Sequence, residues 1–252
     1  MIKKNLLICF LLSFITTGYA TEKVVITSNN YEPYTSSKKN GSGFVLDVVR
    51  EAFKEVGVEV IYEFYPWKRC EFYVLKGKAF AATPYLKTAE RQKLYDFSDP
   101  ITHTYNRFFY NNEKFPDGYN WKKMEDFQEF ILGGTLGYWY IDKFKKAGLT
   151  YTLSTENKNF MLLIRKRIDF LVIDELAGYN ILINNFKEEA HNISVLKNPL
   201  TIGNTSLLIS RKYPKSSELR EKFNKGLKLI KKKSIYKKLL DKYGIPESFA
   251  IK

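Results

Sequence analysis

The feature that most constrains the fold is a regular alternation of short apolar strands with amphipathic helices. In the first third of the mature chain, the pattern predicts strands at 23–28, 59–64 and 79–83 and helices at 44–56 and 67–76. The two helices end next to Gly57 and Gly77, which are typical helix terminators. Short strand–helix–strand connections of this kind indicate an open α/β sheet.

A second series of the same kind follows a strand at 107–110. A short amphipathic helix is predicted at 121–130. Later strands are predicted at 131–135, 151–153, 170–173, 193–196 and 205–210, and helices at 140–147, 157–167, 175–186, 216–232 and 234–243. We therefore expect an α/β protein with two lobes, each a mixed sheet flanked by helices, joined by two hinge strands near Phe108 and Leu207.

The boundaries of the lobes follow from these two hinge strands, where the chain passes from one lobe to the other. Residues 21–108 and 206–252 would form a discontinuous first lobe, and residues 109–205 the second. In open α/β sheets, ligands bind outside the carboxyl ends of the strands. Arg91, Gly137 and Asp174 lie at such ends, so a cleft between the lobes is the expected binding site.

The N-terminus, residues 1–20, has the pattern of a secretory signal peptide. Lys3 and Lys4 precede an apolar run at 6–15, and Gly18-Tyr19-Ala20 is a small-x-small cleavage site. Because no cysteine follows this site, we expect a cleaved, periplasmic protein that is not a lipoprotein.

Composition excludes several other classes of function. After cleavage Cys70 would be the one remaining cysteine, and we expect it to be a small buried residue because it has no internal disulfide partner. No spacing of ligands indicates a metal, and we expect no cofactor. The net charge of +14 includes the two lysines of the leader, which leaves 14 − 2 = +12. Export and the lack of a nucleic-acid motif favour a solvated lysine surface on a monomer, or loose attraction to an anionic membrane.

The stretch 79–100 suggests an anion site. Thr88 is a good N-cap for a helix that begins at Ala89, and Arg91 would lie in its first turn, beside free backbone N–H groups. A guanidinium and free amides can together hold a carboxylate. From these residues alone, a surface arginine at a helix start fits equally well.

Four motifs together resemble a known family. They are Gly43-Phe44-x-x-Asp47, Thr88-x-Glu90-Arg91 followed by Asp96-Phe97-Ser98-x-Pro100, the run Asp169 to Asp174, and the closing Tyr236 with Lys242-Tyr243-Gly244. In order and spacing the mature chain resembles the family 3 extracytoplasmic solute-binding proteins of the polar amino-acid type. That resemblance implies two lobes that close on a small ligand and deliver it to the permease of an ABC importer.

The resemblance also implies roles for individual residues. Arg91 would hold an α-carboxylate, Asp174 an α-ammonium, and Gly137 and Tyr138 would offer backbone N–H groups to the carboxylate. Aromatic residues would flank the ligand side chain, namely Tyr31, Tyr34 and Trp67. The aromatic residues could equally be part of the core or rim, and Asp174 could cap the helix that begins at Glu175.

Several positions depart from the family pattern. Pro84-Tyr85-Leu86 replaces the small and hydroxyl residues that usually bind the ligand, and Leu86 cannot hydrogen-bond. Lys68 and Arg69 could face an acidic group of the ligand or be solvated helix charges. We therefore expect a small polar solute, anionic or zwitterionic, with an amino acid or related carboxylate as the leading class.

Two other functions fit the same scaffold. An enzyme similar to cyclohexadienyl dehydratase would need a general acid or base, and Glu63, Asp174 and Glu175 are the candidates, although no spacing singles out a pair. A ligand-sensing domain would differ only in its partner. The leading prediction is a binding protein with no catalysis of its own.

Overall fold

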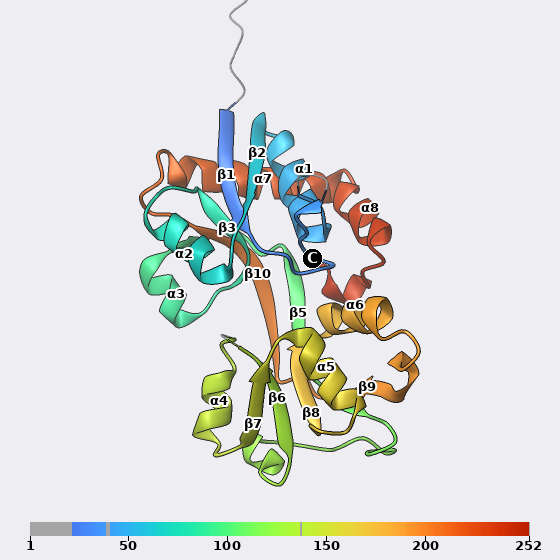
Figure 1. Ribbon diagram of the computed structural model, residues 1–252. Coiled ribbons are helices and arrows are strands. Elements are labelled where there is room, and N and C mark those ends of the chain that lie inside the picture. Colours follow the sequence, from blue (N-terminus) through green and yellow to red (C-terminus); the bar gives the residue numbers. More distant parts are fainter. Residues whose placement is uncertain (1–21, 39–40, 137, 252) are drawn as a thin grey trace, which may run out of the picture.

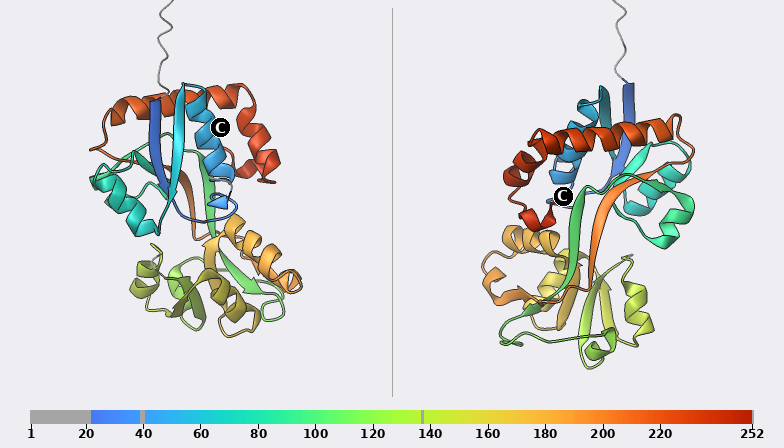
Figure 2. Two further views of the ribbon diagram at one scale, coloured as in Figure 1. Left: turned by 45° about the horizontal axis from the view of Figure 1, so that its top comes forward. Right: turned by 180° about the vertical axis from the view of Figure 1, so that it is seen from behind.

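The structure is a computed structural model that describes residues 22–38, 41–136 and 138–251. The predicted signal peptide and the predicted ligand residue Gly137 lie outside these ranges. Within them the chain forms two α/β lobes joined at a narrow waist, as Figures 1 and 2 show. The predicted α/β fold with two mixed sheets is confirmed.

The first lobe contains a sheet in the order β2-β1-β3-β10. Its strands are β1 (Glu22–Ser28), β2 (Val58–Phe64), β3 (Ala81–Leu86) and the antiparallel β10 (Thr201–Ile209), with the short β4 (Asp96–Phe97) beside β10. Its helices are α1 (Phe44–Lys54), α2 (Trp67–Leu75), α3 (Ala89–Leu94), α7 (Ser216–Lys232) and α8 (Ile235–Lys242). Helices α2 and α3 lie together to one side of this sheet (Figure 1).

Helix α1 holds the core of the first lobe together through close packing against α7. The apolar face of α1 is fully buried, including Phe44 and Phe53, and Phe53 meets Phe223 of α7 at 5.3 Å between ring centroids. The two backbones approach so closely that a Cβ at Gly226 would lie 1.9 Å from the carbonyl oxygen of Ala52. Glycine is therefore required at this crossing.

The second lobe repeats the arrangement with the sheet order β7-β6-β8-β5. Its strands are β5 (Thr102–Asn111), β6 (Ile131–Thr135), β7 (Thr150–Ser154), β8 (Phe170–Asp174) and β9 (Ile193–Val195). Its helices are α4 (Ile141–Lys146), α5 (Glu156–Ile164) and α6 (Glu175–Asn185). Strands β7, β6 and β8 are parallel, and β5 runs against β8.

The prediction of a helix at 121–130 is wrong. Only a 3-10 turn, η2 (Met124–Phe127), forms there. The carboxylate of Asp126 accepts hydrogen bonds from the backbone N–H groups of Lys122 and Lys123, which turns the chain before a helix can begin. Phe127 then stacks on Phe108 at 4.4 Å between ring centroids, so core packing replaces helical hydrogen bonds.

The lobes are connected by β5 and β10, which belong to both sheets. Residues 102–106 of β5 pair antiparallel with residues 201–205 of β10. Beyond this ribbon, β10 continues beside β3 in the first lobe and β5 continues beside β8 in the second. The predicted boundary between residues 108 and 109 falls inside β5, whose Phe108 packs in the core of the second lobe, while Leu207 packs in that of the first.

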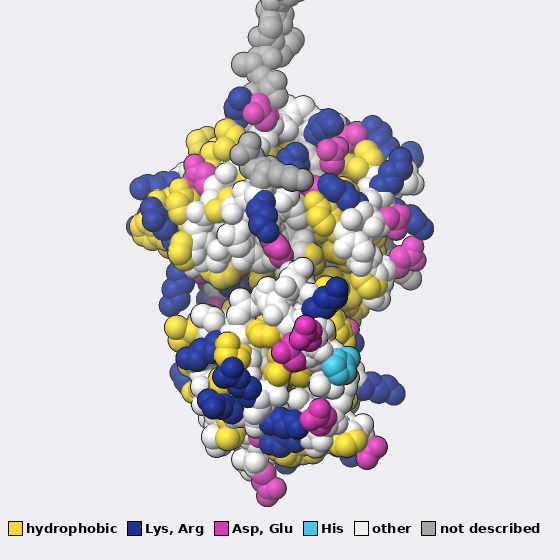
Figure 3. Space-filling model, turned by 45° about the vertical axis from the view of Figure 1, so that its right-hand side comes forward, with side chains coloured by type: hydrophobic (Ala, Val, Ile, Leu, Met, Phe, Trp, Pro, Cys, Tyr) yellow, Lys and Arg dark blue, Asp and Glu magenta, His cyan; other side chains and the backbone are white. Residues whose placement is uncertain are grey.

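The surface charge is dispersed. On the face drawn in Figure 3, Lys and Arg side chains are scattered over both lobes with Asp and Glu side chains among them, and they form no continuous basic stripe. Across the described ranges, no helix combines the length and apolarity that crossing a bilayer would require.

Candidate ligand-binding site

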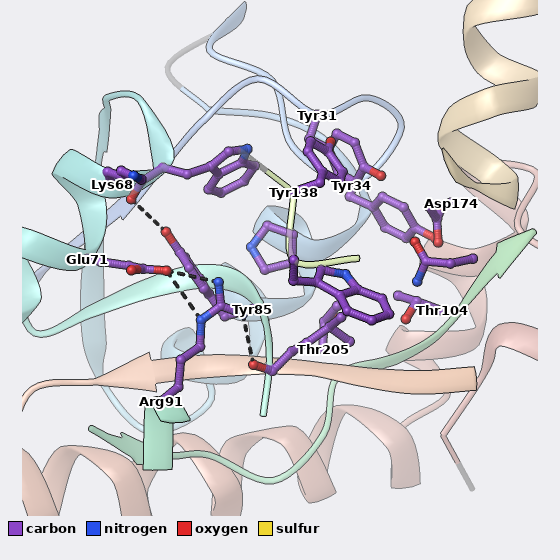
Figure 4. Close-up of a pocket in the computed structure, with 15 residues that line it drawn as sticks. Tyr31, Tyr34, Lys68, Glu71, Tyr85, Arg91, Thr104, Tyr138, Asp174 and Thr205 are labelled. Atoms are coloured by element: carbon purple, nitrogen blue, oxygen red, sulfur yellow. Dashed lines mark hydrogen bonds and ion pairs between the residues drawn. The ribbon is translucent and has the colours of Figure 1, made fainter. Parts of the chain in front are cut away.

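A pocket of about 280 Å³ lies between the lobes, beside the hinge ribbon (Figure 4). Aromatic residues are the commonest kind in its wall, namely Tyr31, Tyr34, Trp67, Tyr85, Tyr138 and Trp139. The other lining residues are Lys68, Glu71, Pro84, Leu86, Arg91, Thr104, Asn106, Asp174 and Thr205. A small, largely aromatic cavity with a few polar groups is typical of a site for a small molecule.

Asp174 is the most deeply buried charged residue of the pocket. It ends β8 and caps α6, and its side chain is 3% exposed. Its Oδ1 accepts hydrogen bonds from the Tyr34 hydroxyl at 2.9 Å and from the Ala177 N–H at 3.2 Å. Among the described residues, Oδ2 has no hydrogen-bond partner. The same carboxylate therefore caps a helix with one oxygen and leaves the other buried oxygen without a partner.

Burial raises the pKa of Asp174 to about 6. Hydrogen bonds from Ala177 and Tyr34 favour the ionised form but offset the loss of hydration only in part. Because no cation in the described residues pairs with this carboxylate, its charge is uncompensated at neutral pH. An ammonium group from a ligand would supply the missing partner.

The hinge strands add polar groups along the pocket, from Asn106, which pairs with Asp174, to Thr205, which pairs with Leu86 beside Arg91. Thr104 of β5 and Thr205 of β10 are buried, and their hydroxyls have no partners within the described ranges. Asn106 donates a bond of 3.3 Å to the Thr201 hydroxyl. The sequence analysis did not predict these residues. The alternation of polar and aromatic residues along β5 was a usable signal for Thr104 and Asn106.

The position of Tyr34 is fixed by the start of α1. The free N–H groups of Phe44 and Val45 donate to the carbonyls of Pro33 and Tyr34, each at 3.0 Å. Gly43 permits this fold-back with a φ of 111°, because a side chain there would collide with the Tyr34 backbone. The loop is thereby held against the helix, and Tyr34 reaches Asp174 across the cleft.

Arg91 lies in the pocket wall, on the side opposite Asp174 (Figure 4). The predicted cap is confirmed, since the Thr88 hydroxyl accepts a bond from the Arg91 N–H. The guanidinium, however, already has a carboxylate partner. Its Nη2 and Nε donate to Oε1 of Glu71 at 2.9 and 3.2 Å, and Nη1 donates to the Leu86 carbonyl at 3.1 Å.

Glu71 is the site residue that sequence reasoning most clearly missed. It follows Trp67 by four residues on α2, so the two side chains share one helix face. That spacing was the available signal. The Arg91 guanidinium also lies 4.7 Å from the centroid of the Tyr85 ring, which packs edge-on against Trp67 at 5.5 Å.

The predicted aromatic residues come together. Tyr31 stacks on Tyr34 at 5.8 Å and meets the edge of Trp67 at 6.3 Å. The predicted role of Tyr138 differed, since its backbone N–H was expected to serve the ligand; that N–H instead donates to the Thr135 carbonyl at 3.2 Å. The Tyr138 side chain lines the pocket from the second lobe, and its hydroxyl donates to a carboxylate oxygen of Glu156. Burial raises the pKa of Tyr31 and of Tyr138 well above the usual value, so both hydroxyls remain protonated.

The structure places the predicted cations Lys68 and Arg69 in different surroundings. Lys68 is exposed and lines the rim of the pocket. The structure does not bring Arg69 to the pocket, because its guanidinium donates to the Tyr73 hydroxyl at 2.7 Å and lies 4.7 Å from the centroid of the Tyr65 ring. On this geometry Arg69 is a surface residue, which was the alternative considered for it.

Metal and thiol chemistry have no support within the pocket. The described residues contain no group of three or more His, Cys, Asp and Glu side chains that could hold a metal ion. Cys70 is buried behind the pocket wall, and burial raises the pKa of its thiol to about 11. Its environment is that of a packed apolar residue.

The fold and the site together define a two-lobed ligand-binding protein with its pocket at the hinge. The sequence model of the bacterial extracellular solute-binding proteins, family 3, matches residues 24–246, so the chain belongs to this family. A comparison with curated protein sequences finds no significant match.

Solved structures share the fold at low sequence identity. The ligand-binding core of GluR0 from Nostoc punctiforme, in complex with L-glutamate, has 19% identity and a TM-score of 0.73, over 88% of this chain and all (100%) of that chain. An ancestral arginine-binding protein bound to arginine has 22% identity and a TM-score of 0.72, over 88% and 97%. A histidine kinase sensor domain similar to periplasmic binding proteins has 17% identity and a TM-score of 0.73, over 88% and 95%.

Proposed function

We propose that the protein binds a small solute with a protonated amino group, an amino acid or a related compound, in the periplasm and delivers it to the permease of an ABC importer. The observation that carries this proposal is the buried carboxylate of Asp174, which lines a pocket between the two lobes and has one oxygen without a hydrogen-bond partner among the described residues. An ammonium would satisfy that oxygen and remove the uncompensated charge.

Binding would shift an equilibrium between open and closed lobes. The pocket is lined by residues from both lobes, such as Trp67 from the first and Tyr138 from the second. A ligand that contacts both walls binds the closed form better and so populates it. The closed form would then be the one that the permease recognises. The family supports this role, and the arginine and glutamate complexes of its structural neighbours support an amino compound as ligand.

We expect no turnover by this protein. Of the three acids that the sequence offers as catalysts, only Asp174 lines the pocket. Glu175 pairs with Arg107 at 2.5 Å, and Glu63 accepts a bond from the Tyr65 hydroxyl. The other carboxylate of the pocket, Glu71, is held by Arg91, so Asp174 has no free base or nucleophile beside it, which favours binding over general acid–base catalysis. A sensory role is the second candidate, because a kinase sensor domain shares the fold.

A thermal-shift screen of amino acids, amines, dicarboxylates and small peptides tests the proposal. A ligand at about 100 times its dissociation constant should stabilise the protein by ~2.7 kcal/mol. Compounds with an amino group should raise the melting temperature of the wild type and of Glu59→Gln, whose carboxylate pairs with Lys23 on the surface. If no compound with an amino group shifts the melting temperature, the proposed function is wrong. Once a ligand is found, co-purification of a permease or of a sensor kinase from membranes would distinguish transport from sensing.

A further inference from the structure

The anion-binding side of the pocket is already occupied by a carboxylate of the protein itself. Glu71 Oε1 accepts from both Nε and Nη2 of Arg91, and the Leu86 carbonyl accepts from Nη1. The Tyr85 ring covers the guanidinium at 4.7 Å. Both partners of the Glu71–Arg91 pair line the pocket, with side chains 29% and 26% exposed. The positive charge of Arg91 is therefore neutralised where it meets the cavity.

The remaining wall around this pair offers few donors to an anionic ligand, and the nearest, the Thr205 hydroxyl on the strand position paired with Leu86, is uncharged and buried. Pro84 has no N–H, and the side chain of Leu86 is apolar, yet both line the pocket. Lys68 is the other cation, and its side chain is exposed at the rim, where water and salt screen its charge. A ligand carboxylate placed beside Arg91 would also lie beside Glu71 and be repelled by it.

The end of the pocket at Asp174 offers an unpaired negative charge instead of a neutralised positive one. Asp174 is 3% exposed and has an unpaired oxygen, and no cation of the described residues faces that oxygen. Six aromatic side chains line the space between the two ends. Aromatic faces attract cations and accommodate an apolar body, but they give no stabilisation to an anion.

We propose that the pocket selects a primary amine with an apolar or aromatic body over the corresponding amino acid, and that Glu71 is the residue that determines this selectivity. The inference rests on the proposed function and narrows its ligand class. Asp174 takes the ammonium, the tyrosines and tryptophans enclose the body, and Glu71 excludes a carboxylate by holding Arg91.

Matched pairs that differ only by a carboxylate provide the test. Calorimetric titration of tyramine and tyrosine, phenethylamine and phenylalanine, and tryptamine and tryptophan would be carried out on the wild type. For at least one pair we expect the amine to bind at least about tenfold more tightly than its amino acid, because like charges brought together cost at least that much. This measurement needs no variant.

Substitution of Glu71 then tests the assignment to that residue. In Glu71→Gln the amide oxygen still accepts a bond from Arg91 but carries no charge, so the ratio of amine to amino-acid affinity should fall by about tenfold or more. Glu71→Ala, which removes the carboxylate from Arg91 and leaves its bond to the Leu86 carbonyl, should also lower the ratio. Glu59→Gln, which removes a carboxylate from a surface ion pair, should leave the ratio unchanged.

The outcomes separate the two proposals. If amino acids bind the wild type as tightly as their amines, or if neither Glu71 variant changes the ratio, the inference is refuted and the proposed function stands. If neither member of any pair binds, both are refuted. If the variants lower amine affinity and leave amino-acid affinity unchanged, Glu71 contacts the amine directly, and the exclusion argument fails.

Discussion

Replacement of Asp174 by asparagine should make the free protein more stable while it abolishes the response to ligand. In Asp174→Asn the amide oxygen can keep both hydrogen bonds of Oδ1, from the Tyr34 hydroxyl and the Ala177 N–H, since asparagine is as good a helix cap as aspartate. What the substitution removes is the buried negative charge. The amide NH₂ would take the place of Oδ2 and present a donor where an ammonium needs an acceptor.

The size of the stabilisation follows from the pKa of Asp174. Burial raises that pKa from 3.8 to about 6, and each unit corresponds to about 1.4 kcal/mol. The ionised carboxylate therefore destabilises the free folded protein at pH 7 by about 2 to 3 kcal/mol relative to a neutral side chain in its place. Since ~1 kcal/mol shifts the melting temperature of a chain of this size by ~2–4 °C, Asp174→Asn should melt several degrees higher.

The pH dependence gives an internal check. Because the folded pKa is higher than the unfolded one, the folded protein binds the extra proton between these two values, and the wild type loses stability as the pH rises from about 4 to about 6. The advantage of Asp174→Asn should therefore be full above pH 6 and absent below pH 4. Asp142→Asn on α4 is a matched control, because its side chain is 79% exposed.

The measurement is a melting curve of each variant at several pH values, with and without a ligand of the wild type. If Asp174→Asn melts below the wild type at pH 7, the ionised carboxylate stabilises the free protein, and our account of its burial is wrong. If the variant still responds to the ligand, Asp174 does not bind the ammonium. Only a variant with a higher melting temperature and no response to ligand fits a carboxylate whose function is to bind the ligand.

Ligand affinity should also depend on pH, on Tyr34 and on the integrity of the first lobe. It should fall up to tenfold per unit as the pH drops below about 6, because a protonated Asp174 cannot pair with an ammonium, and a flat calorimetric profile between pH 4.5 and 7.5 would contradict this. Tyr34→Phe should weaken ligand binding by about 1–3 kcal/mol in calorimetry, since it removes a hydrogen bond to the charged carboxylate; unchanged affinity would exclude a role for that bond. Gly226→Ala should destabilise the protein by more than about 2 kcal/mol in urea unfolding, because its Cβ would lie 1.9 Å from the Ala52 carbonyl oxygen, and a stabilised variant would show that the helices can move apart.

The elements of the fold could be predicted wherever one local pattern determines them. Helix α7 has the predicted bounds, and β6 begins and ends at Ile131 and Thr135 as expected. The pattern failed at 121–130, where the helical spacing of apolar residues serves a turn that inserts aromatic rings into the core. Strands β5 and β10 are longer than predicted because polar residues such as Thr104 and Asn204 obscure their apolar period, yet the sheet pairs them.

The site could be predicted only in part. Asp174 follows from its place at a strand end and the aromatic residues from the family resemblance, and the structure places them around one pocket. Glu71 and Arg91 lie 20 positions apart in the sequence, on two different helices, and no local pattern encodes such a contact. Asp174 likewise acquires its raised pKa from burial between the lobes, which is a property of the assembled fold.

The place of Asp174 relative to the hinge ribbon has a consequence for the order of events in binding. Asp174 pairs in register with Asn106, and Asn106 pairs with Thr201 in the ribbon that joins the lobes. When one body rotates about a pivot, each atom moves in proportion to its distance from the axis. Asp174 lies on the strand next to this ribbon, so we expect its carboxylate to move less on closure than the parts of the cleft farther from the hinge. A ligand cation would therefore meet the carboxylate near its final position, and closure would add the Tyr34 hydrogen bond from the other lobe.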